Sequence, residues 1–428
     1  MNKPQKKGLV PALRFPEFQN AGAWEDYQLG QCLSRHPEYG INAPAVPYTE
    51  NLPTYIRITD ISDDGQIRQD QRVSVAKGVT DENYLEYGDI VLARTGASVG
   101  KSYKYRTEDG RLVFAGFLIR VKPNEEKLNS ELLFQFLSTE RYWHWVNFIS
   151  ARSGQPGING NEYASLPIQL PPTVKEQQKI ADCLASIDDL ITAETQKLAA
   201  LKIHKKGLMQ QLFPAEGETV PRLRFPEFRD AGDWESQKLE GLAKRGSGHT
   251  PNKAESSYYN GGIKWVSLAD SNKLDNGYIY ETKIQISNNG LKNSSAVLHP
   301  SGTVIVSRDA GVGKSAILHS EMAVSQHFIV WVCDQSKLLN WFLYYILQIL
   351  KPTFEMIAVG STIKTIGLPY FKDLCIFIPS VEEQQKIADC LSSVDALIEA
   401  QGERIDALKL HKKGLMQQLF PVMEEVEA

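Results

Sequence analysis

The sequence predicts an α+β protein made of two similar halves, because two long segments occur twice and each second segment follows a strand-rich block. Residues 173–214 align without a gap to residues 380–421, with 29 of 42 positions identical, and "HKKGLMQQLFP" is repeated without change. A second pair, "LRFPEFQNAGAWEDYQL" and "LRFPEFRDAGDWESQKL", begins at Leu13 and Leu223. Such a period indicates a tandem duplication of a unit of about 210 residues.

The composition is typical of a globular protein with two domains. The 428 residues are 42% hydrophobic and 23% charged, and a chain of this length exceeds one ordinary core. No apolar run approaches the roughly 18 residues that span a bilayer, and the basic N-terminus lacks the apolar core of a secretory signal. We therefore expect a cytoplasmic protein. The net charge of −4 leaves nucleic-acid binding open, because binding depends on where the charge lies.

The shared segments are predicted to be long amphipathic helices. Their apolar residues recur at steps of mostly three, four or seven, the stripe of a helix that pairs in a coiled coil. A hydroxyl residue three positions before a glutamate fits a capping box at each start, and a proline stops each helix. These residues are Thr173, Glu176 and Pro214 in the first copy, and Ser380, Glu383 and Pro421 in the second.

Because a whole globular block separates the two helices, they can pair antiparallel. The residues predicted to pair them and to dock other subunits are Ile180, Leu184, Ile187, Gly207, Leu208, Ile387, Leu391, Val394, Gly414 and Leu415. Gly207 and Gly414 lie inside helical stretches, where glycine costs up to about 1 kcal/mol relative to alanine. Two interpretations stay open for them: a tight helix crossing within the pair, or a docking surface for a second protein.

The two blocks between tag and helix share the same predicted order of strands and helices, although their sequences are hard to align. Each has an early strand, then a glycine-led strand ("GDIVLAR" or "GTVIVSR"), a further β-rich run and a helix, around residues 130–149 or 337–354. Strands first and a helix later indicate an α+β domain. The loops differ almost completely, and one framework with two different loop sets is what recognition of two different targets requires.

A lysine-serine pair comes after a glycine-bearing turn in both blocks, in "RTGASVGKS" and "RDAGVGKS". A nucleotide-binding loop needs G-x-x-x-x-G-K-[ST], but Thr95 and Arg308 stand where its first glycine should be. The residues after each pair look extended rather than helical, so we expect no ATP-dependent activity from this chain.

The same loops are candidates for DNA contact, because lysine and serine suit phosphate oxygens and arginine can read guanine. The alternative is a surface hairpin with ordinary solvated charges. The candidate DNA-binding residues are Arg57, Arg94, Lys101, Ser102, Lys104, Lys264, Trp265, Arg308, Lys314 and Ser315. Trp143 and Trp145, on a predicted helix, are expected in the core.

The sequence contains no motif that is typical of a catalytic, cofactor-binding or metal-binding site. Its histidines form no triad, its five cysteines show no metal-binding spacing, and it has neither a glycine-rich cofactor loop nor an N/D-P-P-[YFW] motif for amine methylation. We therefore expect a protein without a catalytic or metal site.

Taken together, the "LRFPEF…W…L" tags, the "GDIVLARTGASVGKS" and "GTVIVSRDAGVGKS" stretches and the "EQQKIADCL…HKKGLMQQLF" helices resemble the specificity subunits of type I restriction-modification systems. The resemblance covers nearly the whole chain. It implies two pseudo-twofold-related α/β target recognition domains separated by an antiparallel coiled coil. The implied boundaries are 1–172 for the first tag and domain, 173–214 for the central helix, 215–379 for the second tag and domain, and 380–428 for the last helix and tail.

The resemblance also implies function and partners. Family members are non-catalytic readers of an asymmetric, bipartite site in double-stranded DNA, with one half-site for each domain and a gap set by the helices. Two methylation subunits that methylate adenine with S-adenosylmethionine, and two restriction subunits that use ATP and magnesium, assemble on them. This chain would itself bind none of these cofactors. Two other hypotheses are the specificity subunit of a combined restriction-methylation enzyme outside type I, and an autonomous enzyme with a fused pseudo-dimeric active site.

Overall fold

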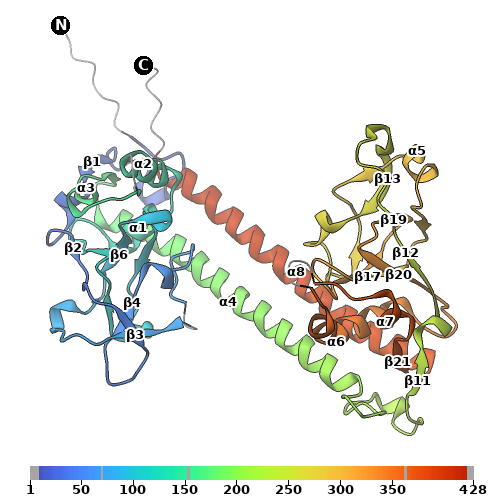
Figure 1. Ribbon diagram of the computed structural model, residues 1–428. Helices are drawn as coiled ribbons and strands as arrows, with labels where there is room; N and C mark the ends of the chain where they lie inside the picture. The colour runs from blue at the N-terminus through green and yellow to red at the C-terminus, as the bar shows by residue number, and fades with distance from the viewer. Residues whose placement is uncertain (1–8, 69–70, 152–154, 361–363, 422–428) are drawn as a thin grey trace. The chain divides into compact units, whose positions relative to one another are not determined.

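The computed structural model describes residues 9–68, 71–151, 155–360 and 364–421 (Figure 1). By their internal contacts the residues form two units, each with sheets of its own. Unit 1 comprises residues 1–195 and 404–428, and unit 2 comprises residues 196–403. Each unit therefore holds parts of both repeats, because the division falls within the two shared helices.

Unit 1 contains two four-stranded sheets. The first has the order β2 (Glu38–Tyr39), β9 (Leu118–Val121), β6 (Ile90–Ala93) and β7 (Ser102–Lys104). The second has the order β3 (Ala45–Pro47), β5 (Val73–Val75), β4 (Thr54–Ile56) and β8 (Leu112–Phe114). All four residues of β6 are buried, so the glycine-led strand is the centre of the core, as its apolar run predicts.

Unit 2 repeats this plan with longer strands. Its five-stranded sheet has the order β12 (Ala243–Ser247), β20 (Phe328–Cys333), β17 (Val304–Ser307), β18 (Ser315–Leu318) and β14 (Tyr278–Ile279). Its four-stranded sheet has the order β15 (Gln285–Ile286), β13 (Tyr259–Val266), β19 (Met322–Val324) and β16 (Leu298–His299). Strand β17 is fully buried and is the counterpart of β6.

Short helices and a two-stranded ribbon complete each unit. Unit 1 has α1 (Ser130–Phe136), α2 (Glu140–Ser150), α3 (Gly160–Ala164) and the pair β1 (Glu25–Gln28) and β10 (Pro167–Leu170). Unit 2 has α5 (Asn288–Lys292), α6 (Asn340–Ile357), α7 (Leu368–Lys372) and the pair β11 (Glu235–Lys238) and β21 (Cys375–Ile378). The ribbon joins the tag of each repeat to the strand that precedes its long helix.

The single helix expected around residues 130–149 is two helices, α1 and α2. The side chain of Thr139 accepts a hydrogen bond from the backbone N–H of Tyr142, which starts a new helix because a hydroxyl at the N-cap satisfies a free amide. Trp143 and Trp145 of α2 pack against the unit 1 core, as expected.

The two shared segments form the long helices α4 (Val174–Leu212) and α8 (Val381–Leu419). They end just before Pro214 and Pro421, as predicted. The capping box is only half formed: the hydroxyls of Thr173 and Ser380 accept hydrogen bonds from the amides of Glu176 and Glu383, each over 3.3 Å. The carboxylates of Glu176 and Glu383 do not accept hydrogen bonds from the backbone amides of Thr173 and Ser380, which a full capping box requires.

The glutamate of each helix instead binds the arginine of its tag. In unit 1, Nε and Nη2 of Arg14 each lie 2.7 Å from an oxygen of Glu176, and in unit 2 the same atoms of Arg224 lie 2.8 and 2.7 Å from Glu383. Both arginines also donate to carbonyl groups within their own tags. A buried fork of this kind is a charge-assisted, bidentate contact, and it explains why the tag and the helix are repeated together.

The glutamine that follows each glutamate is a second matched contact. The side-chain oxygen of Gln177 accepts from the amide of Asn129, while its nitrogen donates to the carbonyl of Lys127. Gln384 makes the same two bonds with Leu339 and Lys337. The repeated "EQQ" letters therefore fasten each helix start to the tag and to the segment before α1 or α6.

Within each unit, α4 and α8 run in opposite directions. In unit 1, Asp188 of α4 lies 2.7 Å from Lys412 of α8, and Glu194 of α4 lies 2.8 Å from Arg404 of α8. Residue numbers along α8 therefore decrease as those along α4 increase. In unit 2, Lys205 lies 2.5 Å from Asp395. The first lysine of each "HKK", Lys205 or Lys412, is thus paired with an aspartate of the opposite helix, which confirms antiparallel pairing.

The predicted pairing residues mostly fix the helices to the domains. Ile180 and Leu184 belong to the unit 1 core and Ile387 and Leu391 to the unit 2 core. Leu415 packs against the first core, Leu208 against the second, and Val394 is buried while Ile187 is half-buried.

The close approach expected at the helical glycines is wrong as a helix crossing. A Cβ atom built on Gly207 or Gly414 meets nothing within 4 Å. Since open space surrounds both positions among the described residues, a tight crossing does not explain them.

The identical ends of the two helices occupy matched sockets. Phe213, just after α4, packs edge-on against Trp234 of the second tag, with ring centroids 5.9 Å apart. Phe420, just after α8, packs against Trp24 of the first tag at 6.2 Å. The first repeat's helix therefore ends in the unit 2 core and the second repeat's helix ends in the unit 1 core.

Candidate functional site

Two arginines occupy the same place in the two units. Arg94 directly follows β6 and Arg308 directly follows β17, and both strands pair with the same kind of neighbour, β9 and β20. The backbone N–H of Arg94 donates to the carbonyl of Phe117 over 3.0 Å, and that of Arg308 donates to the carbonyl of His327 over 2.9 Å. The ladder register therefore matches Arg94 with Arg308, and Phe117 with His327.

Each arginine lies where two distant segments meet. The carbonyl of Arg94 accepts from the amide of Ile158, and the carbonyl of Arg308 accepts from Ile366, over 2.8 and 2.9 Å. Isolated bridges join the following residues, Thr95 and Asp309, to the same two segments. This framework holds the arginine backbone firmly, so its side chain leaves the sheet at a fixed point.

The two guanidinium groups retain free donors. In the part of the chain that the structure describes, neither side chain makes a hydrogen bond or an ion pair, and Nε of each is buried without a partner. The guanidinium carbon of Arg94 lies 4.8 Å from the centroid of the Tyr39 ring. Arginine carries five donors in a planar fork that matches guanine edges and phosphates, so a ligand rich in acceptors fits both places.

The lysines of the two hairpins are used inside each unit. Nζ of Lys101 lies 2.5 Å from Asp63, and this hydrogen bond lowers the pKa of the Asp63 carboxyl. Nζ of Lys314 donates to the carbonyl and the hydroxyl of Ser271 over 3.0 and 3.1 Å. Both lysines therefore tie the hairpin to the loop that follows β4 or β13.

The glycine of each "GKS" is required by packing. Gly100 and Gly313 have φ angles of 89° and 83°, and a Cβ on them would meet Val146 of α2 at 2.8 Å or Lys351 of α6 at 2.9 Å. Only glycine adopts this conformation at such close range without strain. Strands β7 and β18 come next in the chain, which confirms the expected extended continuation and excludes the helix that a phosphate-binding loop needs.

Two of the predicted DNA contacts are buried in the structure. Ser315 has no exposed surface, and its hydroxyl accepts a hydrogen bond from Gln348 over 2.7 Å, whereas its counterpart Ser102 is half-buried. Trp265 is also buried, and its Nε1 donates to the carbonyl of His249 over 3.1 Å.

The role of Trp265 follows from its counterpart in unit 1. Tyr55 has the same place in the parallel pairing of β4 with β8 as Trp265 has in that of β13 with β19. The Tyr55 hydroxyl donates to the carbonyl of Ile41 over 2.7 Å, and Ile41 corresponds to His249. Each unit thus uses a buried aromatic ring with a polar tip to hold the same loop.

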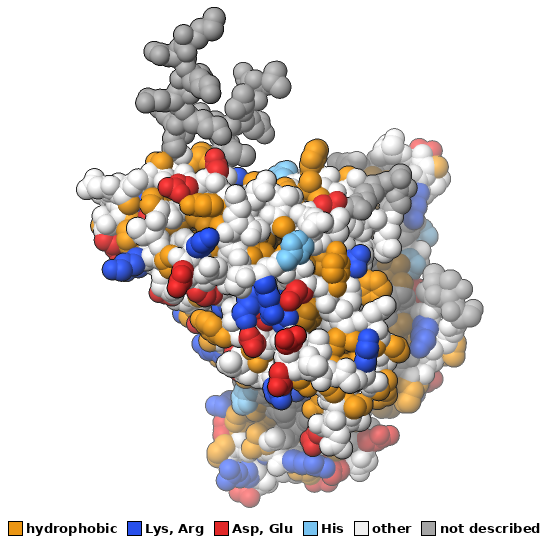
Figure 2. All heavy atoms as spheres, turned by 90° about the vertical axis from the view of Figure 1, so that its left-hand side faces the viewer, with side chains coloured by type: hydrophobic (Ala, Val, Ile, Leu, Met, Phe, Trp, Pro, Cys, Tyr) orange, Lys and Arg blue, Asp and Glu red, His pale blue; other side chains and the backbone are white. Residues whose placement is uncertain are grey.

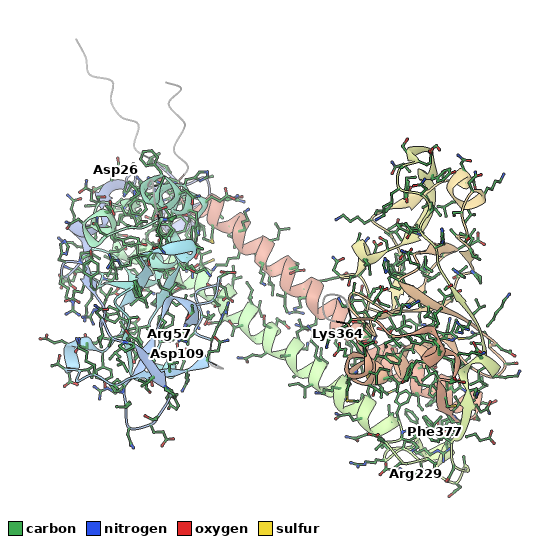
Figure 3. All side chains as sticks on the ribbon, viewed as in Figure 1. Asp26, Arg57, Asp109, Arg229, Lys364 and Phe377 are labelled. Carbon is green, nitrogen blue, oxygen red and sulfur yellow. The ribbon has the colours of Figure 1, made fainter. Side chains whose placement is uncertain are left out.

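The remaining candidates are paired within the protein. Arg57, labelled in Figure 3, holds Asp60 at 2.7 Å, and this hydrogen bond raises the pKa of the arginine further. Lys104 lies 2.6 Å from Glu131, and Lys264 lies 2.8 Å from Glu281. Of the candidate cations, Arg94 and Arg308 are therefore the best placed for an external ligand, and assignment of DNA contacts to any of the ten stays a prediction.

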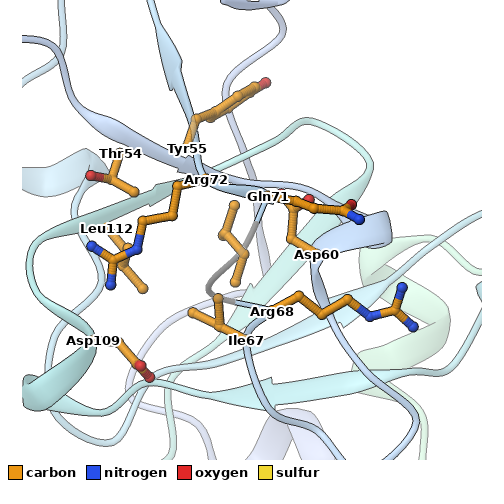
Figure 4. Close-up of a pocket in the computed structure, with 10 residues that line it drawn as sticks. Thr54, Tyr55, Asp60, Ile67, Arg68, Gln71, Arg72, Asp109 and Leu112 are labelled. Carbon is orange, nitrogen blue, oxygen red and sulfur yellow. The ribbon is translucent and has the colours of Figure 1, made fainter. Parts of the chain in front are cut away.

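One cavity of unit 1 borders Asp60, the partner of Arg57. This cavity, which also borders Asp109, has a volume of about 20 Å³, which holds about one water molecule. Figure 4 shows the side chains of Arg68 and Arg72 pointing to opposite sides of it. On the face of unit 1 shown in Figure 2, basic and acidic side chains lie next to one another and form no large area of one sign.

The part of the chain that the structure describes has neither a metal-binding cluster nor a membrane-spanning helix. No group of three or more His, Cys, Asp or Glu side chains in that part of the chain is arranged to hold a metal ion. None of its helices is long and apolar enough to cross a membrane.

Comparison with protein families identifies these blocks. Residues 49–202 and 231–410 match the model of the type I restriction modification DNA specificity domain. The chain belongs to this family of DNA specificity subunits. The two matches cover most of the first strand-rich block, the second block, and most of α4 and α8, so the specificity domain occurs twice, as the duplication indicates.

Relatives agree over most of this specificity subunit. A protein of Methanocaldococcus jannaschii named as the type I restriction enzyme MjaX specificity subunit is 26% identical over 82% of each chain. The type I restriction enzyme MjaVIII specificity subunit of the same organism is 23% identical over 95% of this chain and 93% of its own. The solved S subunit of a type I restriction-modification system from M. genitalium has the same fold, with a TM-score of 0.61 at 13% identity, over 97% of this chain and all of its own.

Sequence reasoning missed the residues that surround the two arginines. Tyr39, Phe117 and His327 come from segments that only the sheet register brings to Arg94 and Arg308. Asp309 follows Arg308 directly in the chain, but its contact with His327 appears only in the structure. These neighbours can be identified by aligning Arg94 with Arg308, provided that the strand paired with each arginine is known.

Proposed function

We propose that this specificity subunit reads an asymmetric, bipartite site in double-stranded DNA and has no catalytic activity of its own. Unit 1 binds one half-site and unit 2 binds the other. The observation that carries the proposal is the pair Arg94 and Arg308, which leave equivalent positions of two related sheets with free donors. Arginine is the commonest reader of guanine in the major groove, and equivalent readers with different neighbours suit two different half-sites.

The partners in this proposal are two methylation subunits and two restriction subunits. Twin surfaces support it: Ile203 with Gly207 in unit 2, and Leu410 with Gly414 in unit 1, are equivalent, and both large side chains are 72% exposed. Exposed apolar side chains beside glycines with open space are suited to a protein partner, and two copies of one surface suit two copies of one partner. S-adenosylmethionine, ATP and magnesium would be bound by these partners and not by this chain.

The experiment is to co-express the chain with the methylation subunit encoded beside it and to map N6-methyladenine across the host genome. The expected result is one motif of two short, different sequences separated by a fixed gap. The control replaces residues 235–379 with the corresponding block of a relative, which should change one half of the motif and leave the other half unchanged. A motif without two parts, or one that the exchange leaves intact, would refute the proposal.

A further inference from the structure

Phe117 and His327 stand beside the two arginines in equivalent positions. The carbonyl of each residue accepts the N–H of Arg94 or Arg308, so each side chain starts from the backbone position directly opposite its arginine. Phe117 is 61% exposed, an unusual place for a large apolar ring, and the side chain of His327 is 30% exposed. A ligand that reaches either arginine therefore comes within reach of the neighbouring ring.

The chemistry around the two arginines differs sharply. In unit 2, Nδ1 of His327 lies 2.6 Å from a carboxylate oxygen of Asp309, and Nε2 of His327 lies 3.5 Å from the amide nitrogen of Gln326. In unit 1, the residue that follows the arginine is Thr95, which has no carboxylate, and the ring of Tyr39 lies under the guanidinium. One arginine thus has aromatic neighbours without a charge, and the other has a network with a carboxylate.

These neighbours select different features of a base pair. A carboxylate accepts only, so Asp309 places the hydrogen on Nδ1 of His327. The lone pair of Nε2, which among the described residues has only the long 3.5 Å contact with Gln326, is then the acceptor that the ring can offer to a ligand. Such a nitrogen forms a hydrogen bond with a base edge. A phenylalanine ring forms none, but in the major groove it packs against the C5-methyl group of thymine.

We propose that Phe117 and His327 are a matched pair of specificity-determining residues. Phe117 selects a thymine next to the base bound by Arg94, and His327, oriented by Asp309, selects a hydrogen-bonding base edge next to the base bound by Arg308. The inference rests on the proposed DNA-reading function and adds to it one readable position in each half-site.

The test maps the methylation motif of the complex that contains the Phe117→His or the His327→Phe subunit. Each change should alter one position of one half-motif and leave the other half intact. The matched control is Tyr48→His, because Tyr48 is a 43% exposed aromatic residue of unit 1 just after β3, and its motif should equal that of the unchanged subunit. A side chain with a merely structural role would lower methylation at every site without altering the motif.

A second measurement changes the DNA and starts from the unchanged complex. Once the motif is known, replacing its selected thymine with deoxyuridine removes one methyl group and should weaken binding of the unchanged complex by about fourfold. The same replacement should have no effect on the Phe117→His complex. Equal binding of both duplexes by the unchanged complex, together with unaltered motifs in both variants, would overturn this inference while a bipartite motif still supported the proposed function. Failure of the proposed function would instead appear as the lack of a bipartite motif in the unchanged complex.

Discussion

Arg224 and Glu383 form a buried, two-pronged ion pair between the tag of the second repeat and the first turn of α8. Nε and Nη2 lie 2.8 and 2.7 Å from the two carboxylate oxygens, and the side chains are 7% and 1% exposed. The hydrogen bonds from the guanidinium to Glu383 raise the pKa of Arg224. Arg14 and Glu176 repeat the arrangement in unit 1. These pairs connect the repeated "LRFPEF" tag to the repeated "EQQKIADCL" start of the long helix.

Removal of one partner should destabilise the unit strongly. Arg224→Ala leaves the Glu383 carboxylate buried without a partner, so we expect the free energy of unfolding of unit 2 to fall by about 3–5 kcal/mol. The measurement is denaturant unfolding followed by the fluorescence of the tryptophans. Arg222→Ala is the control, because Arg222 is 72% exposed and 4.0 Å from Glu218, and such a change costs less than about 0.5 kcal/mol. Equal effects of the two changes would contradict the assigned role.

The buried rings of Tyr55 and Trp265 should contribute to stability and not to DNA sequence preference. Tyr55→Phe removes hydrogen bonds to the carbonyls of Ile41 and Ala43 and should cost about 1–3 kcal/mol of stability. Trp265→Phe should act similarly in unit 2, and neither change should alter the methylation motif. The exposed Tyr280 offers a control, since Tyr280→Phe should leave both stability and motif unchanged. A new base preference in the Trp265 variant would restore that residue to the DNA surface.

The two arginines can be tested by binding. Arg94→Ala and Arg308→Ala should each weaken specific binding by about 1–3 kcal/mol and relax the preference at one position of one half-site. Lys264→Ala is the comparison, because Lys264 is held by Glu281. If an arginine contacts phosphate instead, its loss weakens binding to all sequences alike and lowers the salt dependence. Competition assays over several salt concentrations distinguish these outcomes.

His299 makes unit 2 sensitive to acid. Burial lowers the pKa of this imidazole, so the unfolded chain takes up a proton at a higher pH than the folded chain does. The neutral ring therefore contributes its stability fully above the unfolded pKa of about 6.5, and this contribution is lost as the pH falls towards the folded pKa. We expect His299→Leu to flatten the decrease in unfolding free energy below neutral pH. His204→Gln, at an exposed position on α4, should keep the slope of the unchanged protein.

The repeat and the periodicity predicted the framework well, because hydrophobic patterns are local and duplicated segments constrain each other. The long helices, their proline ends and the buried β6 and β17 follow from such patterns. The destination of Glu176 was missed because its partner, Arg14, lies 162 positions away in the sequence. A local capping rule cannot anticipate a distant guanidinium, which binds a carboxylate more strongly than a backbone amide does.

The candidate DNA contacts were harder to predict, because a residue type shows what a side chain can bind but not whether it is free. Lys101, Lys314 and Arg57 suit phosphate chemically, yet the fold uses them to connect its own loops. Trp265 is in an aromatic-rich stretch and still faces inward. Arg94 and Arg308 are distinguished only by the sheet register, which places them beside Phe117 and His327 and leaves their donors free.

The packing of Phe420 in the unit 1 core has a consequence for the order in which the two units fold during synthesis. Trp24, near the start of the chain, packs against a ring at position 420, and Met416 and Leu419 belong to the same core. During translation the residues of the first tag emerge early, but their core lacks these side chains until residues 416–420 have been synthesised. Unit 2 takes both of its helix segments from residues 196–403 and can be completed earlier. The half of the protein that is synthesised first is thus the half that finishes folding last.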